Sequence, residues 1–338
     1  MTDRTAWAEP GVDEVAPGVH RIPLPLPNDG LRAVNVYALT TDDGLVLVDA
    51  GWDIPAARTL LADGLAGLGG SLADVRRFLV THSHRDHYTQ AVAVRREHGA
   101  RIGLGAGERP TLDALQNADR SPLMAQVHQL LALGAPALAE TIGGWVRDHR
   151  PDLSQWETPD EWLLPGEIAL PGGRVLEAVE TPGHTAGHLV FHDLATGLLF
   201  AGDHVLPTIT PSIGFEPVLS DNPLGAFLRS LTLVRSRPDA LLLPAHGPVA
   251  PSVHARVDEL LDHHGRRLDE AEQAVRTGAS SAYDVAGVLR WTRREHRLAD
   301  LDPFNAMLAV FETGAHLDLL AAQGRLTRTD DDGVRRYR

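Results

Sequence analysis

One stretch constrains the chain more than any other. It is the apolar run Phe78-Leu79-Val80, followed directly by Thr81-His82-Ser83-His84-Arg85-Asp86-His87. An apolar run that ends abruptly in polar residues predicts a buried strand. In an extended backbone His82 and His84 lie on the same side, and Asp86 and His87 follow where the chain turns into a helix. Four side chains of metal-binding types surround one point, so we expect a metal site at the C-terminal end of this strand.

The composition narrows the chemistry of such a site. Cysteine is absent from the 338 residues, which excludes disulfides, thiolate-bound metals and a cysteine nucleophile. A metal must then be held by histidine and carboxylate ligands, which suits zinc, iron or manganese. The net charge of −14 repels a phosphate backbone, so nucleic acid is a disfavoured partner. No N-terminal signal pattern and no membrane-length apolar run is visible, and we expect a cytoplasmic protein without a membrane partner.

The first half of the chain predicts a sheet with a β–α–β unit. Strand patterns over residues 18–24, 32–39 and 45–48 form an opening antiparallel meander, and Asp53 with Pro55 predicts the start of a helix. The strand at 78–81, a helix over about 89–97 and a strand at 101–104 follow. The ligands then lie at the carboxyl end of a strand, where ligand sites in α/β sheets are expected. Apolar residues at three- and four-residue steps predict a helical insertion over about 109–150.

A second β region repeats the same arrangement of strand and ligand. Strand patterns cover residues 168–170, 174–181, 188–193, 198–201 and 241–243. Three of these strands are followed closely by a residue of ligand type, namely His184, Asp203 and His246. With the first stretch, a strand that leads into a ligand-bearing turn occurs four times in the chain.

These motifs resemble those of the metallo-β-lactamase superfamily. Residues 81–87 match its T-H-x-H-x-D-H signature, and its later motifs follow in the same order as Thr181-Pro182-Gly183-His184-Thr185-Ala186-Gly187-His188, Gly202-Asp203 and Ala245-His246-Gly247. The resemblance covers about residues 15–250 and has a glyoxalase II-like ligand set. It implies an α+β fold in which two sheets pack face to face between outer helices, an αββα sandwich, with residues 1–250 as the catalytic domain.

The resemblance also implies a ligand assignment and a mechanism. It implies two metal ions, usually zinc, although the ligands also admit iron or manganese. A metal-bridging hydroxide would form near neutral pH, and Asp86 would also orient it as the catalytic residue. The implied ligands of the first ion are His82, His84 and His184, those of the second are Asp86, His87 and His246, and Asp203 bridges both.

Other polar residues near these motifs carry weaker expectations. Asp49 either accepts a ring N–H from a ligand histidine or bonds nearby backbone as a turn residue. We do not count His188 or His204 as ligands. Tyr88 is expected to pack rather than to contact substrate. Many relatives have an apolar residue and a glycine pair after the ligand run, whereas this chain has Tyr88-Thr89-Gln90, so the pocket wall differs there.

The C-terminal residues 251–338 predict a separate helical domain. Helical patterns over 253–278 and 303–323 precede a hairpin pattern over 325–337 with Asp332-Gly333 at its turn. This order resembles the winged-helix-like module of the β-lactamase-like-2 branch of the superfamily. A winged helix does not by itself imply DNA binding. We favour packing against the catalytic domain or a role in a homodimer.

The leading functional hypothesis is a dinuclear metal-dependent hydrolase of a small-molecule acyl substrate, a carboxylic thioester, ester or lactone. Apolar residues of the insertion could cover an acyl chain, or they could simply form core. The alternative is a phosphodiesterase or ribonuclease of the same fold. Electron transfer, as in diiron flavoproteins, is disfavoured because those proteins usually carry glutamate where this chain has His84. An inert site with a DNA-binding C-terminal module is the remaining non-enzyme option.

Overall fold

The structure is a computed structural model that describes residues 5–27, 30–117, 124–148, 152–292 and 294–338. Two sheets form its centre. The first has seven strands whose spatial order equals their order in the chain. They are β1 (Asp13–Ala16), β2 (Val19–Pro25), β3 (Ala33–Thr41), β4 (Gly44–Val48), β5 (Val75–Val80), β6 (Arg101–Gly105) and β7 (Glu161–Leu163). The first four strands are antiparallel, and β2 to β4 form the predicted meander, whereas β4 to β7 are parallel.

The second sheet has five strands in the order β12-β11-β10-β9-β8. It is antiparallel except for the pair β11 and β12. A separate C-terminal hairpin completes the strands. The bounds are β8 (Gly166–Ala169), β9 (Val175–Glu180), β10 (Leu189–Asp193), β11 (Leu198–Gly202), β12 (Leu241–Pro244), β13 (Arg328–Asp331) and β14 (Val334–Tyr337).

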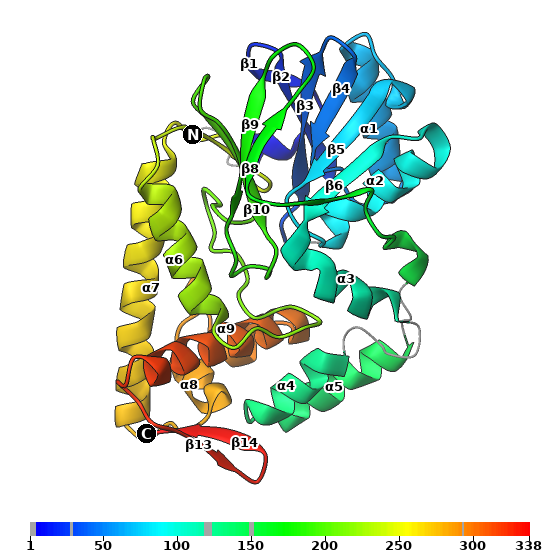
Figure 1. The fold of residues 1–338 in the computed structure, drawn as a ribbon. Helices are drawn as coiled ribbons and strands as arrows, with labels where there is room; N and C mark the ends of the chain where they lie inside the picture. Colours follow the sequence, from blue (N-terminus) through cyan, green and yellow to red (C-terminus); the bar gives the residue numbers. More distant parts are fainter. Residues whose placement is uncertain (1–4, 28–29, 118–123, 149–151, 293) are drawn as a thin grey trace.

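Helices cover the outer faces of both sheets (Figure 1). Their bounds are α1 (Pro55–Gly67), α2 (Arg85–His98), α3 (Arg109–Gln116), α4 (Met124–Ala132), α5 (Pro136–Asp148), α6 (Pro223–Arg235), α7 (Val253–Arg276), α8 (Ala282–Val288) and α9 (Pro303–Ala322). Short 3₁₀ turns lie at Ala6–Ala8, Leu72–Asp74, Ala106–Glu108, Leu153–Gln155 and Leu298–Asp300. Among the described residues, no helix has both the length and the apolar character that a membrane crossing requires.

The alternation of side chains along the central strands creates the layers. Phe78 of β5 points to the outer face of the first sheet, where it joins the core beneath α1 and α2, whereas Leu79 points to the inner face. On that inner face Tyr37 and Phe200 of the two sheets meet edge to face, with ring centroids 5.4 Å apart. Because both faces of β5 are covered, its last three residues are all apolar. The predicted αββα sandwich is therefore confirmed.

A third core region lies below the sandwich and joins distant parts of the chain. Helices α6 and α7 pack on the outer face of the second sheet, and α9 packs against α4, α5, α7 and α8. Figure 1 shows α9 in the space between α6 and the pair α4 and α5. The predicted division at residue 250 falls just before α7, and α7 contacts both α6 and α9. The insertion and the C-terminal helices thus share one hydrophobic core.

Several local predictions need correction or extension. Residues 118–123 and 149–150 of the predicted insertion lie outside the described residues. The helix expected over about 89–97 begins at Arg85, and the N-cap of α1 is Ile54, so Asp53 does not cap it. Strands β1 and β7 and helix α6 were not predicted.

The C-terminal hairpin is as expected. Asp332 and Gly333 both have positive φ at its turn, 49° and 78°, as a two-residue hairpin turn requires. The winged-helix assignment stays a prediction.

Candidate metal centre

The first four predicted ligands are placed by the step from β5 to α2. Strand β5 ends at Val80, and residues 81–84 form the connection to α2, in which His84 takes the N-cap position. Asp86 and His87 then lie in the first helical turn. Because the connection is so short, the four side chains stay at the carboxyl edge of the sheet, where the β–α–β pattern placed them.

The other three predicted ligands come from the second sheet. His184 follows β9, Asp203 directly follows β11, and His246 follows β12. Gly202 before Asp203 has φ of 50°, and a Cβ atom there would lie 2.7 Å from both His188 Nε2 and Thr81 Oγ1. Only glycine fits between these two loops, and its presence lets the edges of the two sheets approach each other.

The structure brings all seven predicted residues together. Donor atoms of His82, His84, His184 and Asp203 lie within 4.8 Å of one another, as do those of Asp86, His87 and His246. Asp203 faces both groups, because its Oδ2 is 3.4 Å from His184 Nε2 and its Oδ1 is 3.3 Å from His246 Nε2. A carboxylate in this position can hold one cation with each oxygen.

The unpaired atoms of the site fit metal ions. The Nε2 atoms of His82, His87 and His246 and the Oδ1 atom of Asp203 are buried, and none has a hydrogen-bond partner among the described residues. Buried polar atoms normally have partners, and leaving one unpaired costs about 1–3 kcal/mol. Four such atoms that converge on one space indicate that cations complete the site.

The opposite ring nitrogens are held in the orientation that metal binding needs. His87 Nδ1 lies 2.9 Å from Asp49 Oδ2, His184 Nδ1 lies 2.8 Å from the Ser212 carbonyl oxygen, and His246 Nδ1 lies 2.7 Å from that of Ala33. Because a carbonyl or carboxylate oxygen can only accept a hydrogen bond, the ring nitrogen beside it must carry a proton. In the neutral form of each ring the lone pair is therefore on Nε2, as in histidines that bind metals. His184 Nε2 lies 3.1 Å from His84 Nδ1, so these two nitrogens share a hydrogen bond when no metal is bound.

The two groups differ in their charge. Burial lowers the pKa of His84 to about 3 and that of His184 to about 4, so these rings are neutral. Burial also lowers the pKa of His87, but the carboxylates of Asp49, Asp86 and Asp203 outweigh it and raise this pKa to about 10. Without metal, His87 therefore keeps a second proton, whose positive charge balances the carboxylates around it. A divalent cation bound by Asp86, His87 and His246 would displace that proton.

Asp49 supports the site in the way that one of its two sequence interpretations predicted. Besides pairing with His87, its carboxylate accepts the Thr81 amide N–H at 2.8 Å and the Thr81 hydroxyl at 3.0 Å. Its φ is 59°, a left-handed conformation that is uncommon outside glycine. That bend at the end of β4 turns the carboxylate toward β5, so Asp49 ties the first ligand loop to His87.

His188 and His204 were not expected to be ligands, and Tyr88 was expected to pack. Both ring nitrogens of His188 are engaged, Nδ1 with the Thr181 hydroxyl and Nε2 with the Asp203 amide N–H. His204 is buried, and neither His188 nor His204 belongs to a ligand group of the described residues. Tyr88 is buried and its hydroxyl donates to the Glu157 carbonyl, which confirms a packing role.

Sequence reasoning missed Glu108, a fully buried carboxylate behind the ligand loops. It accepts hydrogen bonds from the hydroxyls of Ser83 and Thr185 and from the amides of Ser83 and Gly187. Burial raises its pKa, and these donors oppose that shift. Because its partners lie on the loops before His84 and after His184, Glu108 holds the two halves of the first ligand group together.

Two aromatic rings lie beside the ligand His84. The Phe215 ring lies 6.3 Å from the His84 ring, and Phe304 of α9 lies 5.7 Å from Phe215 at their centroids. Phe304 is 48% exposed. The C-terminal region thus reaches toward the ligand residues through one exposed ring.

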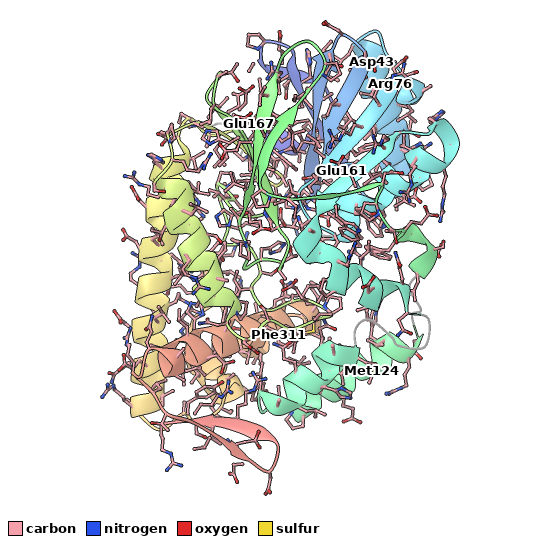
Figure 2. All side chains as sticks on the ribbon, viewed as in Figure 1. Asp43, Arg76, Met124, Glu161, Glu167 and Phe311 are labelled. Atoms are coloured by element: carbon pink, nitrogen blue, oxygen red, sulfur yellow. The ribbon has the colours of Figure 1, made fainter. Side chains whose placement is uncertain are left out.

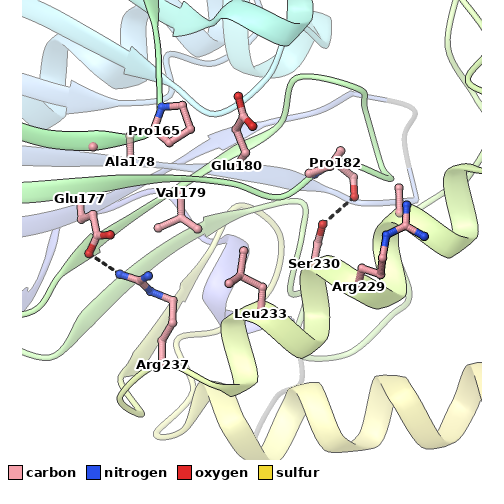
Figure 3. Close-up of a pocket in the computed structure, with 12 residues that line it drawn as sticks. Pro165, Glu177, Ala178, Val179, Glu180, Pro182, Arg229, Ser230, Leu233 and Arg237 are labelled. Carbon is pink, nitrogen blue, oxygen red and sulfur yellow. Dashed lines mark hydrogen bonds and ion pairs between the residues drawn. The ribbon is translucent and has the colours of Figure 1, made fainter.

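A surface groove of about 720 Å³ lies elsewhere, between β9 and α6 (Figure 3). Arg237 pairs with Glu177 across it, and the Ser230 hydroxyl donates to the Pro182 carbonyl at 2.9 Å. None of the seven predicted ligands lines this groove, so it is separate from the metal centre.

Comparisons with family models agree with the geometry. A model described as "Metallo-beta-lactamase superfamily" matches residues 29–246, and one described as "Metallo-beta-lactamase-like, C-terminal domain" matches residues 268–338. Among solved structures, a metallo-beta-lactamase family protein from Thermus thermophilus is similar with a TM-score of 0.77 and 29% identity, covering 96% of this chain and 99% of that one.

Two curated relatives illustrate the similarity in sequence. The probable metallo-hydrolase YqjP of Bacillus subtilis (strain 168) is 27% identical over 326 residues, which cover 91% of this chain and 92% of the relative. The atrochrysone carboxyl ACP thioesterase nsrC of Aspergillus novofumigatus (strain IBT 16806) is 25% identical over 287 residues, covering 85% and 71%.

Proposed function

This chain belongs to the metallo-β-lactamase superfamily and is a hydrolase, and on that premise we propose that it is a dinuclear metal-dependent hydrolase of carboxylic thioesters. The observation that carries the proposal is the position of Asp203 between two groups of histidine nitrogens, in which Nε2 of His82, His87 and His246 has no hydrogen-bond partner among the described residues. Two divalent cations, for which zinc is our proposal, would supply a hydroxide near neutral pH and polarise the scissile carbonyl.

The chain's own residues would act around that chemistry. Asp86 is our proposed catalytic residue, because its carboxylate lies 3.4 Å from His246 Nε2 and is still 14% exposed. The side chain of Asp203 is 9% exposed and that of His87 is fully buried. Asp86 can therefore accept a proton from a water that enters from solvent, and the other ligands fix the geometry around it.

Two observations support an acyl substrate. Relatives are named as acyl carrier protein thioesterases, and the approach to His84 is lined by the rings of Phe215 and Phe304. The apolar residues of α4 and α5, in contrast, belong to the core beneath α9, among them Leu130 and Ile142. These core residues are not available to a bound chain, whereas Leu131 and Trp145 of the same helices are exposed. We propose that the aromatic pair beside His84, rather than the core of the insertion, contacts the acyl chain.

The experiment is a hydrolysis screen of purified protein against thioesters, simple esters, lactones and a phosphodiester. We expect thioester cleavage that disappears after chelation and returns with Zn²⁺. The variant Asp86→Asn should lose activity. Asp193→Asn removes a buried carboxylate that pairs with Arg174 at 2.9 Å, away from the ligands, and should keep it. Cleavage that persists in metal-free protein, or a preference for the phosphodiester, would contradict the proposal.

A further inference from the structure

A second cluster of histidine and glutamate lies outside the metal centre, between α7 and α9. One nitrogen each of His263 and His264 on α7 and one carboxylate oxygen of Glu312 on α9 lie within 4.8 Å of one another. Figure 2 marks this part of α9 by Phe311, the residue before Glu312. None of these side chains belongs to the seven ligands, and the proposed reaction does not use them.

A hydrogen-bonded relay determines which nitrogen of His264 is free. His316 Nδ1 lies 2.7 Å from the carbonyl oxygen of Glu312, one turn earlier on α9. That nitrogen must carry the proton, because a carbonyl oxygen can only accept. His316 Nε2 is then an acceptor, and His264 Nδ1, 3.2 Å away, donates to it. The remaining nitrogen of His264, Nε2, therefore carries a lone pair and no proton.

The relay requires neutral rings, and their surroundings provide them. Both rings are buried. Burial lowers the pKa of His316 to about 3 and holds that of His264 well below its usual range. The neighbouring Arg267 adds to both pKa shifts, because a cation disfavours another positive charge nearby.

The cluster consequently contains acceptors without a donor. His264 Nε2 is buried and has no hydrogen-bond partner among the described residues. The carboxylate of Glu312 likewise has no donor in that part of the chain. Burial raises the pKa of Glu312, and the charge of Arg267 opposes this shift. The Arg267 guanidinium itself pairs with Glu270 at 3.1 Å and lies 4.5 Å from the centre of the Trp291 ring.

An imidazole nitrogen with a lone pair and a nearby carboxyl group are suitable ligands for a cation, which would displace the proton that burial favours on Glu312. Two histidines and one glutamate form a set that Zn²⁺ uses at sites with three protein ligands and one open position. A histidine whose other nitrogen donates to a fixed acceptor is typical of metal ligands. We propose that His263, His264 and Glu312 hold a further divalent cation of the zinc class, which joins α7 to α9 independently of the catalytic centre.

The location indicates a structural role. Helix α9 contacts α4, α5, α7 and α8, and it carries Phe304, which packs against Phe215 beside the ligand His84. A cation between α7 and α9 would fix α9 on the second half of the sandwich. It would also give the folded chain a ligand that the unfolded chain lacks, which raises stability with metal concentration.

The test compares the wild type with Glu312→Gln, which keeps the size of the side chain but removes its charge. Glu270→Gln is the matched control, since Glu270 is on α7, pairs with Arg267 and is not a ligand. Each protein is freed of metal, reloaded with excess Zn²⁺, dialysed and measured for zinc per chain. We expect Glu312→Gln to bind one zinc fewer than the wild type and Glu270→Gln to bind the same number.

Thermal unfolding gives a second readout that does not depend on activity. Zn²⁺ should raise the Tm of the wild type by more than that of Glu312→Gln. Without metal, Glu312→Gln should be at least as stable as the wild type, because it lacks the unpaired carboxylate. If it does not fold, His263→Ala replaces it, since His263 is only partly buried. Equal zinc content and equal Tm gains in the wild type and Glu312→Gln would overturn the proposal. If the proposed catalytic centre binds no metal, the zinc content of all three proteins falls by the same number, and the difference between the wild type and Glu312→Gln remains.

Discussion

The role of Asp49 leads to a prediction whose size follows from its contacts. The carboxylate accepts three hydrogen bonds, from His87 Nδ1 at 2.9 Å, the Thr81 amide at 2.8 Å and the Thr81 hydroxyl at 3.0 Å. In Asp49→Asn one oxygen remains for Thr81, and the new amide group would face the N–H of His87. Two donors then meet at a site where Asp49 is only 2% exposed.

The expected loss is moderate and specific. Removing the partner of a ligand histidine typically weakens metal binding tenfold to a hundredfold, which corresponds to about 1.4–2.7 kcal/mol. This range agrees with the cost of about 1–3 kcal/mol for leaving a buried donor unpaired. We expect the loss at the proposed metal site of Asp86, His87 and His246. Binding at the other proposed site, formed by His82, His84 and His184, should be nearly unaffected, because Thr81 keeps its bonds.

The assay is a competition titration of metal-free protein with Zn²⁺ against a chelator of known affinity. Asp193→Asn is the control, because Asp193 is buried at a strand end and pairs with Arg174 but touches no ligand. Its zinc affinities should equal those of the wild type. If Asp49→Asn binds both metals as tightly as the wild type, or if Asp193→Asn weakens binding as much, the argument that Asp49 orients His87 is refuted.

Three further predictions address the surroundings of the centre. Phe304→Ala should raise KM for long acyl thioesters about twofold to tenfold, which corresponds to the loss of one aromatic contact. KM for acetyl thioesters should be unchanged. Equal effects on both substrates would contradict a contact between Phe304 and the acyl chain. Glu108→Gln should lower the free energy of unfolding in urea by about 1–3 kcal/mol, because each carboxylate oxygen accepts from one backbone amide and one hydroxyl, and a side-chain amide nitrogen in its place leaves that backbone N–H unpaired. Unchanged stability would refute its bridging role. Burial, opposed by the Ala186 amide and aided by Glu108, raises the pKa of Glu216 from 4.5 to about 8. The folded chain then keeps a proton that the unfolded chain releases, so stability falls from about pH 5 to pH 8 by at most about 1.4 kcal/mol per pH unit, and Tm of Glu216→Gln should fall less over that range.

The sequence was informative where function depends on short local patterns. Residues 81–87 predict a strand that leads into ligands because spacing along an extended backbone determines which side chains share a face. The three later ligands follow strands in the same way, and their convergence was expected only from the family resemblance. The unbroken apolar run at the end of β5 likewise predicted the burial of that strand.

Features that depend on distant partners could not be read from local patterns. Glu108 is a single carboxylate whose partners Ser83 and Thr185 lie 25 and 77 residues away. Strand β7 has three residues and is a strand because it pairs with β6.

Helix α6, in contrast, had a local signal that the prediction overlooked. Asn222 accepts the Gly225 amide N–H at the N-cap, and Pro223 follows.

The metal assignment is tested most directly by a crystal structure of the zinc-loaded protein with anomalous diffraction measured at the zinc edge. We predict two anomalous peaks among the seven ligand residues, with one carboxylate oxygen of Asp203 at about 2.0–2.2 Å from each. A single peak, or two peaks of which Asp203 reaches only one, would contradict the claim that this side chain joins two metal ions into one hydrolytic centre.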